Sequence, residues 1–283
     1  MIKMDDEYIG DKYLLSISGG KDSTAMILYM REIAARDVDY VFMDTGWEDP
    51  QTYQYLNYLE TKLDISINRI RSNVEIKPEY QEVYNECLDL MGREYSDFVA
   101  LILNKGMFPS GAFKWCTIHL KIEPFQKFIN EIDYEPVSCV GIRKEESKRR
   151  SNYSEYEYNE GFDCWVWRPL IDWKEQEIIN IHKRHSIKPN PLYLKGSSRV
   201  GCYPCIYSNK RELSELIIDH NHVKVIRKLE DFVSQKRNKE VTFFRGGRID
   251  DILDWSRTSR GGKQYFLFES KTPTCEKWGM CGI

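Results

Sequence analysis

The chain has 283 residues, of which 41% are hydrophobic and 30% are charged, and its net charge at pH 7 is −3. This is an ordinary globular composition, with room for one large α/β domain and an appendage or for two small domains. The net charge creates no overall positive field that would favour nucleic acid, and no apolar run reaches the ~20 residues of a membrane span. The acidic first residues, MIKMDDEYIGDK, lack the apolar core of a secretory signal, so we expect a cytoplasmic protein.

A glycine turn near the N-terminus connects a predicted strand to a predicted helix. The apolar strand 13–17 runs into Ser18-Gly19-Gly20-Lys21-Asp22-Ser23, and a helical pattern follows over 24–35. This arrangement presents backbone N–H groups and a helix N-terminus to an anion, usually a phosphate. It is not a Walker A loop, because Leu15 stands where that motif requires glycine and Asp22 where it requires Ser or Thr.

Further strands and helices predict a parallel sheet. A strand over 38–43 ends at Asp44-Thr45-Gly46, and later strands are expected over 65–70 and 137–140 and from 165. Helices are expected over 51–63, 74–103, 174–184 (capped by Asp172) and 209–237, and a surface loop over 153–162. Strand–helix–strand units of about 30 residues give right-handed crossovers, and ligands of such sheets bind beyond the C-terminal strand ends. Loops 18–23 and 44–46 should therefore face one crevice.

Six ordered motifs over 13–205 resemble the PP-loop ATP pyrophosphatases and phosphoadenylylsulfate (PAPS) reductases. The most specific match is the pattern N-P-L-Y-x-x-G-x-x-R-x-G-C-x-P-C over 190–205, and G-x-R-x-x-E-S-x-x-R is matched over 141–150. The resemblance implies a doubly wound α/β fold with a mostly parallel, Rossmann-type sheet over 1–205, followed by a small helical, Cys-containing region over 206–283.

The resemblance also implies the site residues. It assigns catalytic roles to Lys21, Asp22 and Asp44, and it implies an adenine nucleotide (ATP, or PAPS or adenylylsulfate) with Mg²⁺. Arginines at a strand end suit the binding of the nucleotide's phosphates, because guanidinium binds oxyanions in a bidentate manner. The nucleotide-binding residues that it implies are Ser18, Gly19, Gly20, Lys21, Asp22, Ser23, Asp44, Thr45, Gly46, Gly141, Arg143 and Arg150.

The eight cysteines point to metal or redox chemistry rather than disulfides in a cytosolic chain. By analogy with the iron–sulfur reductases, Cys116, Cys202 and Cys205 would bind a [4Fe–4S] cluster together with a tail cysteine. Alternatively, a Cys₄ zinc site would join the C-x-x-C pair to the tail, or the thiols would be reduced and free of metal. The tail offers Cys275 and Cys281, whereas Cys87, Cys139 and Cys164 are expected in the core.

The preferred function is an ATP pyrophosphatase that adenylylates a substrate oxygen for sulfur insertion. The chain looks most like the sulfur-activating enzyme of DNA phosphorothioation systems, which implies DNA and a cysteine desulfurase or other sulfur-relay proteins as partners. One alternative is a PAPS or adenylylsulfate reductase with Cys281 as the nucleophile, although Cys-Gly-Ile at the end of the chain only partly matches the reductase motif E-C-G-x-H. The other is a regulatory module that binds a nucleotide without catalysis.

A basic segment over 242–265 is the remaining candidate surface. It places Arg245, Arg248, Arg257, Arg260 and Lys263 among glycines and aromatic residues. It could bind a nucleic-acid backbone or the nucleotide of a neighbouring subunit in a homodimer. A solvated loop is the other interpretation.

Overall fold

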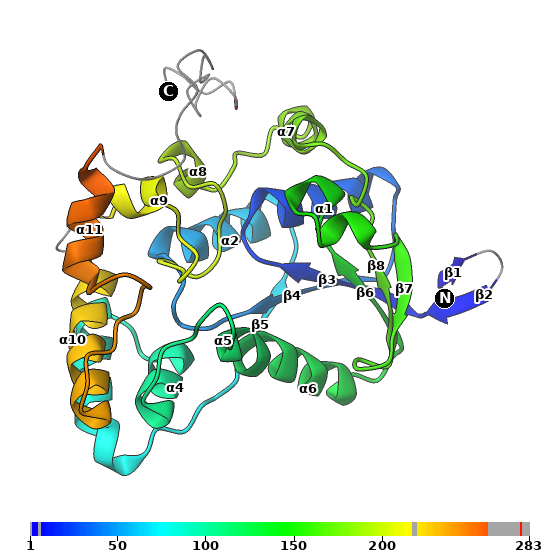
Figure 1. Cartoon of the computed structure of the whole chain (residues 1–283). Coiled ribbons are helices and arrows are strands. Elements are labelled where there is room, and N and C mark those ends of the chain that lie inside the picture. The colour runs from blue at the N-terminus through cyan, green and yellow to red at the C-terminus, as the bar shows by residue number, and fades with distance from the viewer. Residues whose placement is uncertain (1, 5–6, 217–219, 260–277, 279–283) are drawn as a thin grey trace.

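The structure, a computed structural model, describes residues 2–4, 7–216, 220–259 and 278. At its centre lies a six-stranded sheet in the order β5-β4-β3-β6-β8-β7 (Figure 1). The first five of these strands run parallel and β7 pairs antiparallel to β8. A separate hairpin joins β1 (Ile2–Met4) to β2 (Glu7–Gly10). The strands of the sheet are β3 (Lys12–Ile17), β4 (Val38–Met43), β5 (Ile67–Ile70), β6 (Pro136–Val140), β7 (Tyr156–Asn159) and β8 (Cys164–Trp167).

Strand β3 occupies the position where the strand order reverses. Its partner on one side is β4, which follows it in sequence, and its partner on the other side is the later strand β6. In doubly wound sheets this position opens a crevice beyond the C-terminal strand ends. The loops after β3, β4 and β6 therefore share one edge of the sheet, as the sequence predicted.

Helices cover both faces of the sheet because neighbouring strand residues point to opposite sides. Leu15 packs on one face with α1 (Lys21–Glu32), α2 (Pro50–Leu63) and α7 (Glu175–Arg184). Leu14 packs on the other face against α6 (Glu123–Glu131). The predicted α/β doubly wound fold is confirmed, and Cys87, Cys139 and Cys164 are buried as expected.

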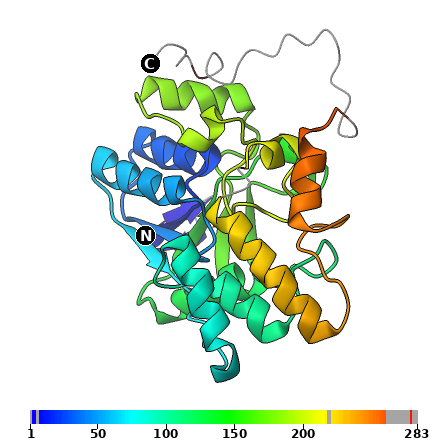
Figure 2. The same ribbon diagram turned by 90° about the vertical axis from the view of Figure 1, so that its left-hand side faces the viewer.

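A second helical core lies beside the sheet. It is formed by α3 (Gln81–Met91), α4 (Asp97–Lys105), α10 (Asn221–Arg237) and α11 (Ile249–Arg257). Figures 1 and 2 show α10 running along α3, and the core they share contains buried residues from both sides of position 205. The division into domains at that position stays a prediction. The short helices are α5 (Trp115–Thr117), α8 (Pro191–Leu194) and α9 (Lys210–Ser214), with single turns η1 (Pro78–Tyr80), η2 (Ile118–Ile122), η3 (Lys144–Glu146) and η4 (Arg150–Asn152).

Three local predictions are corrected by the structure. The helix expected over 74–103 is interrupted, because Gly92 ends α3 in the left-handed conformation and the Ser96 side chain caps α4. The surface loop expected over 153–162 contains the edge strand β7. Asp172 does not cap α7, since Lys174 is the N-cap and Asp172 instead pairs with Lys144 at 2.6 Å.

Candidate nucleotide-binding site

The loop between β3 and α1 is closed by its own hydroxyl groups. The Ser23 Oγ accepts from the Ser18 N–H at 3.2 Å and donates to the Gly20 carbonyl at 3.1 Å, and the Gly20 N–H donates to the Ser18 Oγ at 3.3 Å. Gly19 has a φ of +70°, a backbone conformation that residues with a side chain rarely adopt, and Gly20 is the N-cap of α1. The result is a compact turn at a helix N-terminus, which is the geometry that binds phosphate.

The loop backbone is held from outside by the segment 190–193. The Asn190 side-chain amide donates to the Gly19 carbonyl at 3.1 Å, and the Tyr193 hydroxyl accepts from the Lys21 N–H at 3.1 Å. The His182 Nε2 lies 2.9 Å from the Lys21 carbonyl, and His182 is buried, which lowers its pKa. The N-P-L-Y pattern was found in the sequence, but its contact with the backbone of loop 18–23 was not predicted. The specificity of that match was the available signal.

The loop after β6 packs directly against the start of α1. A Cβ on Gly141 would lie 2.9 Å from the Asp22 carbonyl oxygen and 3.1 Å from the Ser23 nitrogen, so only glycine fits. Arg143 is 3% exposed, and its Nε donates to Asp22 at 2.6 Å while the guanidinium also pairs with Glu145. Lys21 contacts the other oxygen of Asp22 at 3.1 Å. The structure therefore joins Lys21, Asp22 and Arg143 in one ion-pair chain at the crevice.

Asp44, at the end of β4, is 2% exposed and accepts three hydrogen bonds from within the protein. These come from the Gly46 N–H at 2.9 Å, the Tyr53 hydroxyl at 2.7 Å and the Tyr95 hydroxyl at 2.6 Å. Gly46 itself has a φ of +68°, and its Cα faces Ser96 so closely that a Cβ would approach within 2.6 Å. The Asp44–Gly46 turn is thus rigidly built.

The neighbouring carboxylate of Glu48 completes this turn. It accepts from the Thr45 hydroxyl at 2.8 Å and from the Trp47 N–H at 3.2 Å, and burial raises its pKa. Glu48 was not among the site residues predicted from the sequence. A buried glutamate directly after a strand-end turn is visible in the sequence only as one charge among many.

A cavity of about 490 Å³ adjoins the loop. Its wall includes Thr45 and also Val200, whose Cβ lies 4.0 Å from the position of a Cβ on Gly20. The cysteines predicted as ligands meet here, because the cavity is lined by Cys116, Cys202 and Cys205. The volume falls in the range typical of small-molecule sites.

Lys121 lines the same cavity and lies within electrostatic range of all three thiols and of Glu48. The attraction of Cys202 raises the pKa of Lys121, and burial raises the pKa of Cys202 to about 12 against the opposing effect of Lys121. Among the residues that the structure describes, no three histidine, cysteine or acidic side chains stand close enough to hold one metal ion. The three thiols share a cavity without forming a finished single-metal site.

Comparison with known proteins agrees with this geometry. Residues 12–208 match the phosphoadenosine phosphosulfate reductase domain. The chain belongs to this family. A 37.8 kDa protein from the gpa 5′ region of Escherichia phage 186 is 31% identical over an alignment 307 residues long, and the match covers 90% of this chain and 90% of that protein. The PAPS reductase of Proteus mirabilis is 25% identical over 195 residues, 69% of this chain and 71% of that enzyme. The PAPS reductase of Candida auris, solved as a phosphate complex, shares the fold, with a TM-score of 0.50 at 17% identity over 69% of this chain and 83% of that one.

In this member of the PAPS reductase family, one described residue of the tail contacts the loop's supports. The Trp278 ring is 4% exposed and lies 5.2 Å from the His182 ring and 6.3 Å from the Tyr193 ring, measured between centroids. These are the two side chains that hold Lys21. Cys275 and Cys281, predicted as ligands or nucleophile, lie outside the described residues.

The remaining predicted binding residues are Arg150 and those of the basic segment. Arg150 lines the cavity and pairs with Glu146. In the basic segment, Arg248 pairs with Asp231, and Arg257 donates to the Leu216 carbonyl at 2.7 Å. Arg260 and Lys263 lie outside the described residues.

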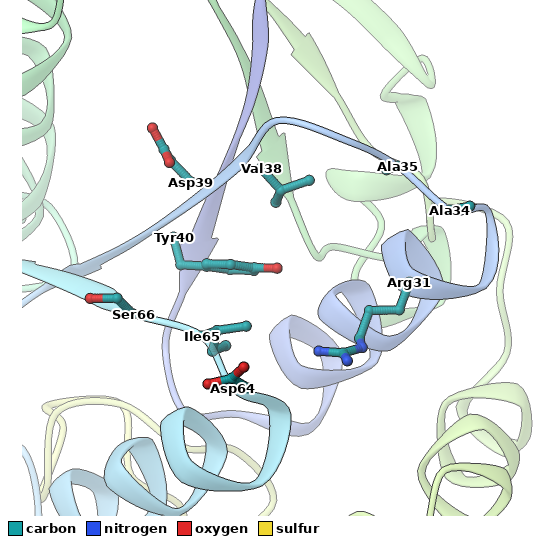
Figure 3. Close-up of a pocket in the computed structure, with 9 residues that line it drawn as sticks. All are labelled: Arg31, Ala34, Ala35, Val38, Asp39, Tyr40, Asp64, Ile65 and Ser66. Carbon is teal, nitrogen blue, oxygen red and sulfur yellow. The ribbon is translucent and has the colours of Figure 1, made fainter.

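A second hollow, of about 570 Å³, lies at the opposite edge of the sheet. Figure 3 shows Arg31, Tyr40 and Asp64 at its wall. Arg31 lies in the last turn of α1, Asp64 is the C-cap of α2 and Tyr40 lies near the start of β4. The hollow is therefore remote from the C-terminal strand ends where this fold binds ligands. No described helix combines the length and apolarity that crossing a bilayer demands.

Proposed function

We propose that this protein is an ATP pyrophosphatase that activates an acceptor oxygen for replacement by sulfur. The observation that carries the proposal is the junction of two features. The phosphate-binding turn 18–23 opens at the switch point of the sheet, and a cavity lined by three thiols begins beside it at Val200. The turn suits the phosphates of a nucleoside triphosphate, and the thiol-lined cavity suits sulfur chemistry.

The proposed reaction has two displacement steps. The acceptor oxygen attacks the α-phosphorus of ATP, the bond to the bridging oxygen breaks, and pyrophosphate leaves with the electron pair. A hydrosulfide donor then attacks the adenylylated acceptor and expels AMP. Such reactions depend mainly on positioning and on neutralising phosphate charge.

In this scheme the loop residues bind the leaving group. The backbone N–H groups at the start of α1 and the ammonium of Lys21 neutralise the pyrophosphate, together with Mg²⁺ brought by the nucleotide. Asp22 holds both Lys21 and Arg143 through the ion pairs described above. Asp44 acts as a positioning residue, since its three hydrogen bonds fix the turn that presents Thr45 to the cavity.

We place the sulfur donor of the proposed reaction in the thiol-lined cavity. Three cysteines are one ligand short of the set that holds an iron–sulfur cluster, and the fourth would come from a tail cysteine.

Pyrophosphate release tests the proposal. The full chain is incubated with ATP, Mg²⁺, hydrosulfide and either DNA or tRNA. Lys21→Ala and Asp22→Asn should each abolish acceptor-dependent release, because each removes a member of the ion-pair chain. Lys127→Ala, at a side chain 76% exposed on α6, is the control and should retain full activity. Full activity in both loop variants would refute the proposal.

The family name supports one second candidate, a PAPS reductase that uses Cys281. That candidate predicts release of sulfite from PAPS in the presence of thioredoxin, with no pyrophosphate from ATP. Cys281→Ser would abolish the sulfite release. Tight ATP binding with neither activity would instead indicate a regulatory nucleotide-binding module.

A further inference from the structure

Three side chains from separate segments meet at the mouth of the thiol-lined cavity. Lys114 precedes α5, Arg199 follows α8, and Tyr207 follows the C-x-x-C pair. The Tyr207 ring is 46% exposed, the Lys114 Nζ lies 5.1 Å from its centroid, and the Arg199 Cζ lies 5.9 Å from it. All three line the cavity, so an exposed aromatic ring is flanked by two cations at its entrance.

The two cations keep their charge available. Within the described part of the chain, neither Lys114 nor Arg199 forms an ion pair with an acidic side chain. The acidic residue of the cavity wall, Glu212, is 6% exposed, and its oxygens accept from the Ser198 hydroxyl at 2.6 Å and the Asn209 N–H at 3.0 Å. The carboxylate of Glu212 is therefore already hydrogen-bonded within the protein. Arg248 of the segment 242–265, unlike Lys114 and Arg199, is paired with Asp231.

We propose that Lys114, Arg199 and Tyr207 bind the phosphates and one base of a polynucleotide at the cavity mouth. A polynucleotide offers flat bases and a phosphate at every residue, and proteins that grip single strands combine basic grooves with exposed aromatic rings. Phe113, the sequence neighbour of Lys114, is also an exposed aromatic residue, at 47%. In the proposed function the phosphates of the adenine nucleotide bind at loop 18–23, so the cations at the mouth remain for the acceptor.

This inference rests on the proposed function, because it names the acceptor class for the same cavity. It would place a phosphodiester or base oxygen of the polynucleotide beside the junction of nucleotide loop and thiols. An acidic protein partner would also satisfy the two cations, but it would make no use of the ring.

Fluorescence anisotropy with labelled single-stranded DNA and RNA, measured without ATP over a range of salt concentrations, tests the inference. Tyr207→Ala should weaken binding roughly fivefold or more, and Tyr207→Phe should bind like the parent chain, because stacking needs the ring and not the hydroxyl. Lys114→Gln with Arg199→Gln should reduce the salt slope by about 1.4, since each phosphate contact on a single strand contributes about 0.7. Lys127→Gln should change neither quantity, and thermal melting checks that each variant is folded.

The outcomes separate the two proposals. Tighter binding of DNA or of RNA identifies the source of the acceptor. If oligonucleotide binding depends on Tyr207 but no pyrophosphate is released, the proposed function is refuted and this inference is supported. Absence of oligonucleotide binding would overturn this inference. So would binding that Tyr207→Ala leaves unchanged and that polyglutamate competes away as well as unlabelled oligonucleotide does.

Discussion

Replacing Gly141 by alanine probes how closely the nucleotide loop is held. The added Cβ would meet the Asp22 carbonyl oxygen at 2.9 Å and the Ser23 nitrogen at 3.1 Å, and both atoms belong to backbone that cannot rotate away. Overpacking of this kind costs about 1–3 kcal/mol. For about 2 kcal/mol in a chain of this size the melting temperature should fall by roughly 4–8 °C. The shift must move the first turn of α1, so ATP affinity should fall about tenfold for each 1.4 kcal/mol expressed at the loop.

The assays are differential scanning calorimetry and isothermal titration with a non-hydrolysable ATP analogue. Gly111→Ala is the matched control, because its Cβ would meet only the Tyr207 hydroxyl oxygen, at an ordinary 3.5 Å, in an unrestricted backbone conformation. If Gly141→Ala and Gly111→Ala gave the same melting temperature and the same affinity, the contact between the β6 loop and the phosphate turn would not exist as described.

Three further predictions concern the loop, the buried His222 of α10 and the thiol-lined cavity. Tyr193→Phe removes the acceptor for the Lys21 N–H and should weaken ATP binding by about 0.5–1.5 kcal/mol, measured by titration; unchanged affinity would show that this contact does not shape the loop. Burial holds the pKa of His222 well below 6.5, so stability should be lost as pH falls below about 6.5, at up to about 1.4 kcal/mol per pH unit, and His222→Phe should flatten that slope in urea unfolding. An identical slope in the variant would contradict this. Protein purified without oxygen should contain iron and show the broad visible absorption of a thiolate-ligated iron–sulfur cluster. Cys116→Ser should lose both, and zinc or no metal in the parent chain would refute the cluster.

The sequence predicted what local patterns determine. The strand over 38–43 and the helix after Pro50 were found because period-two and helical patterns are written within a few residues. The turn 18–23 was found because its glycines, strand and helix are adjacent in the chain. The edge strand β7 was missed although its sequence YEYN alternates tyrosine with polar residues, because an alternation over only four residues is a weak signal.

Long-range contacts were beyond such patterns. Asn190 and Tyr193 reach the loop across more than 170 positions, and nothing near either end announces these hydrogen bonds. In the basic segment over 242–265, the ion pair of Arg248 with Asp231 on α10 was likewise not visible in the local pattern, and binding by this segment stays a prediction. The gathering of Cys116 with the C-x-x-C pair was obtained only through family resemblance, and the cations around Tyr207 became visible only in the folded chain.

The place of Trp278 changes how experiments on the tail must be designed. A deletion that ends the chain before this residue would strip the indole from His182 and Tyr193 as well as removing Cys281, so a loss of activity would have two causes at once. The role of the Cys281 thiol has to be tested by a single-atom change such as Cys281→Ser, in a chain that keeps Trp278. A purification tag fused after position 283 would sit close in sequence to the same indole. Tags for this protein therefore belong at the other end.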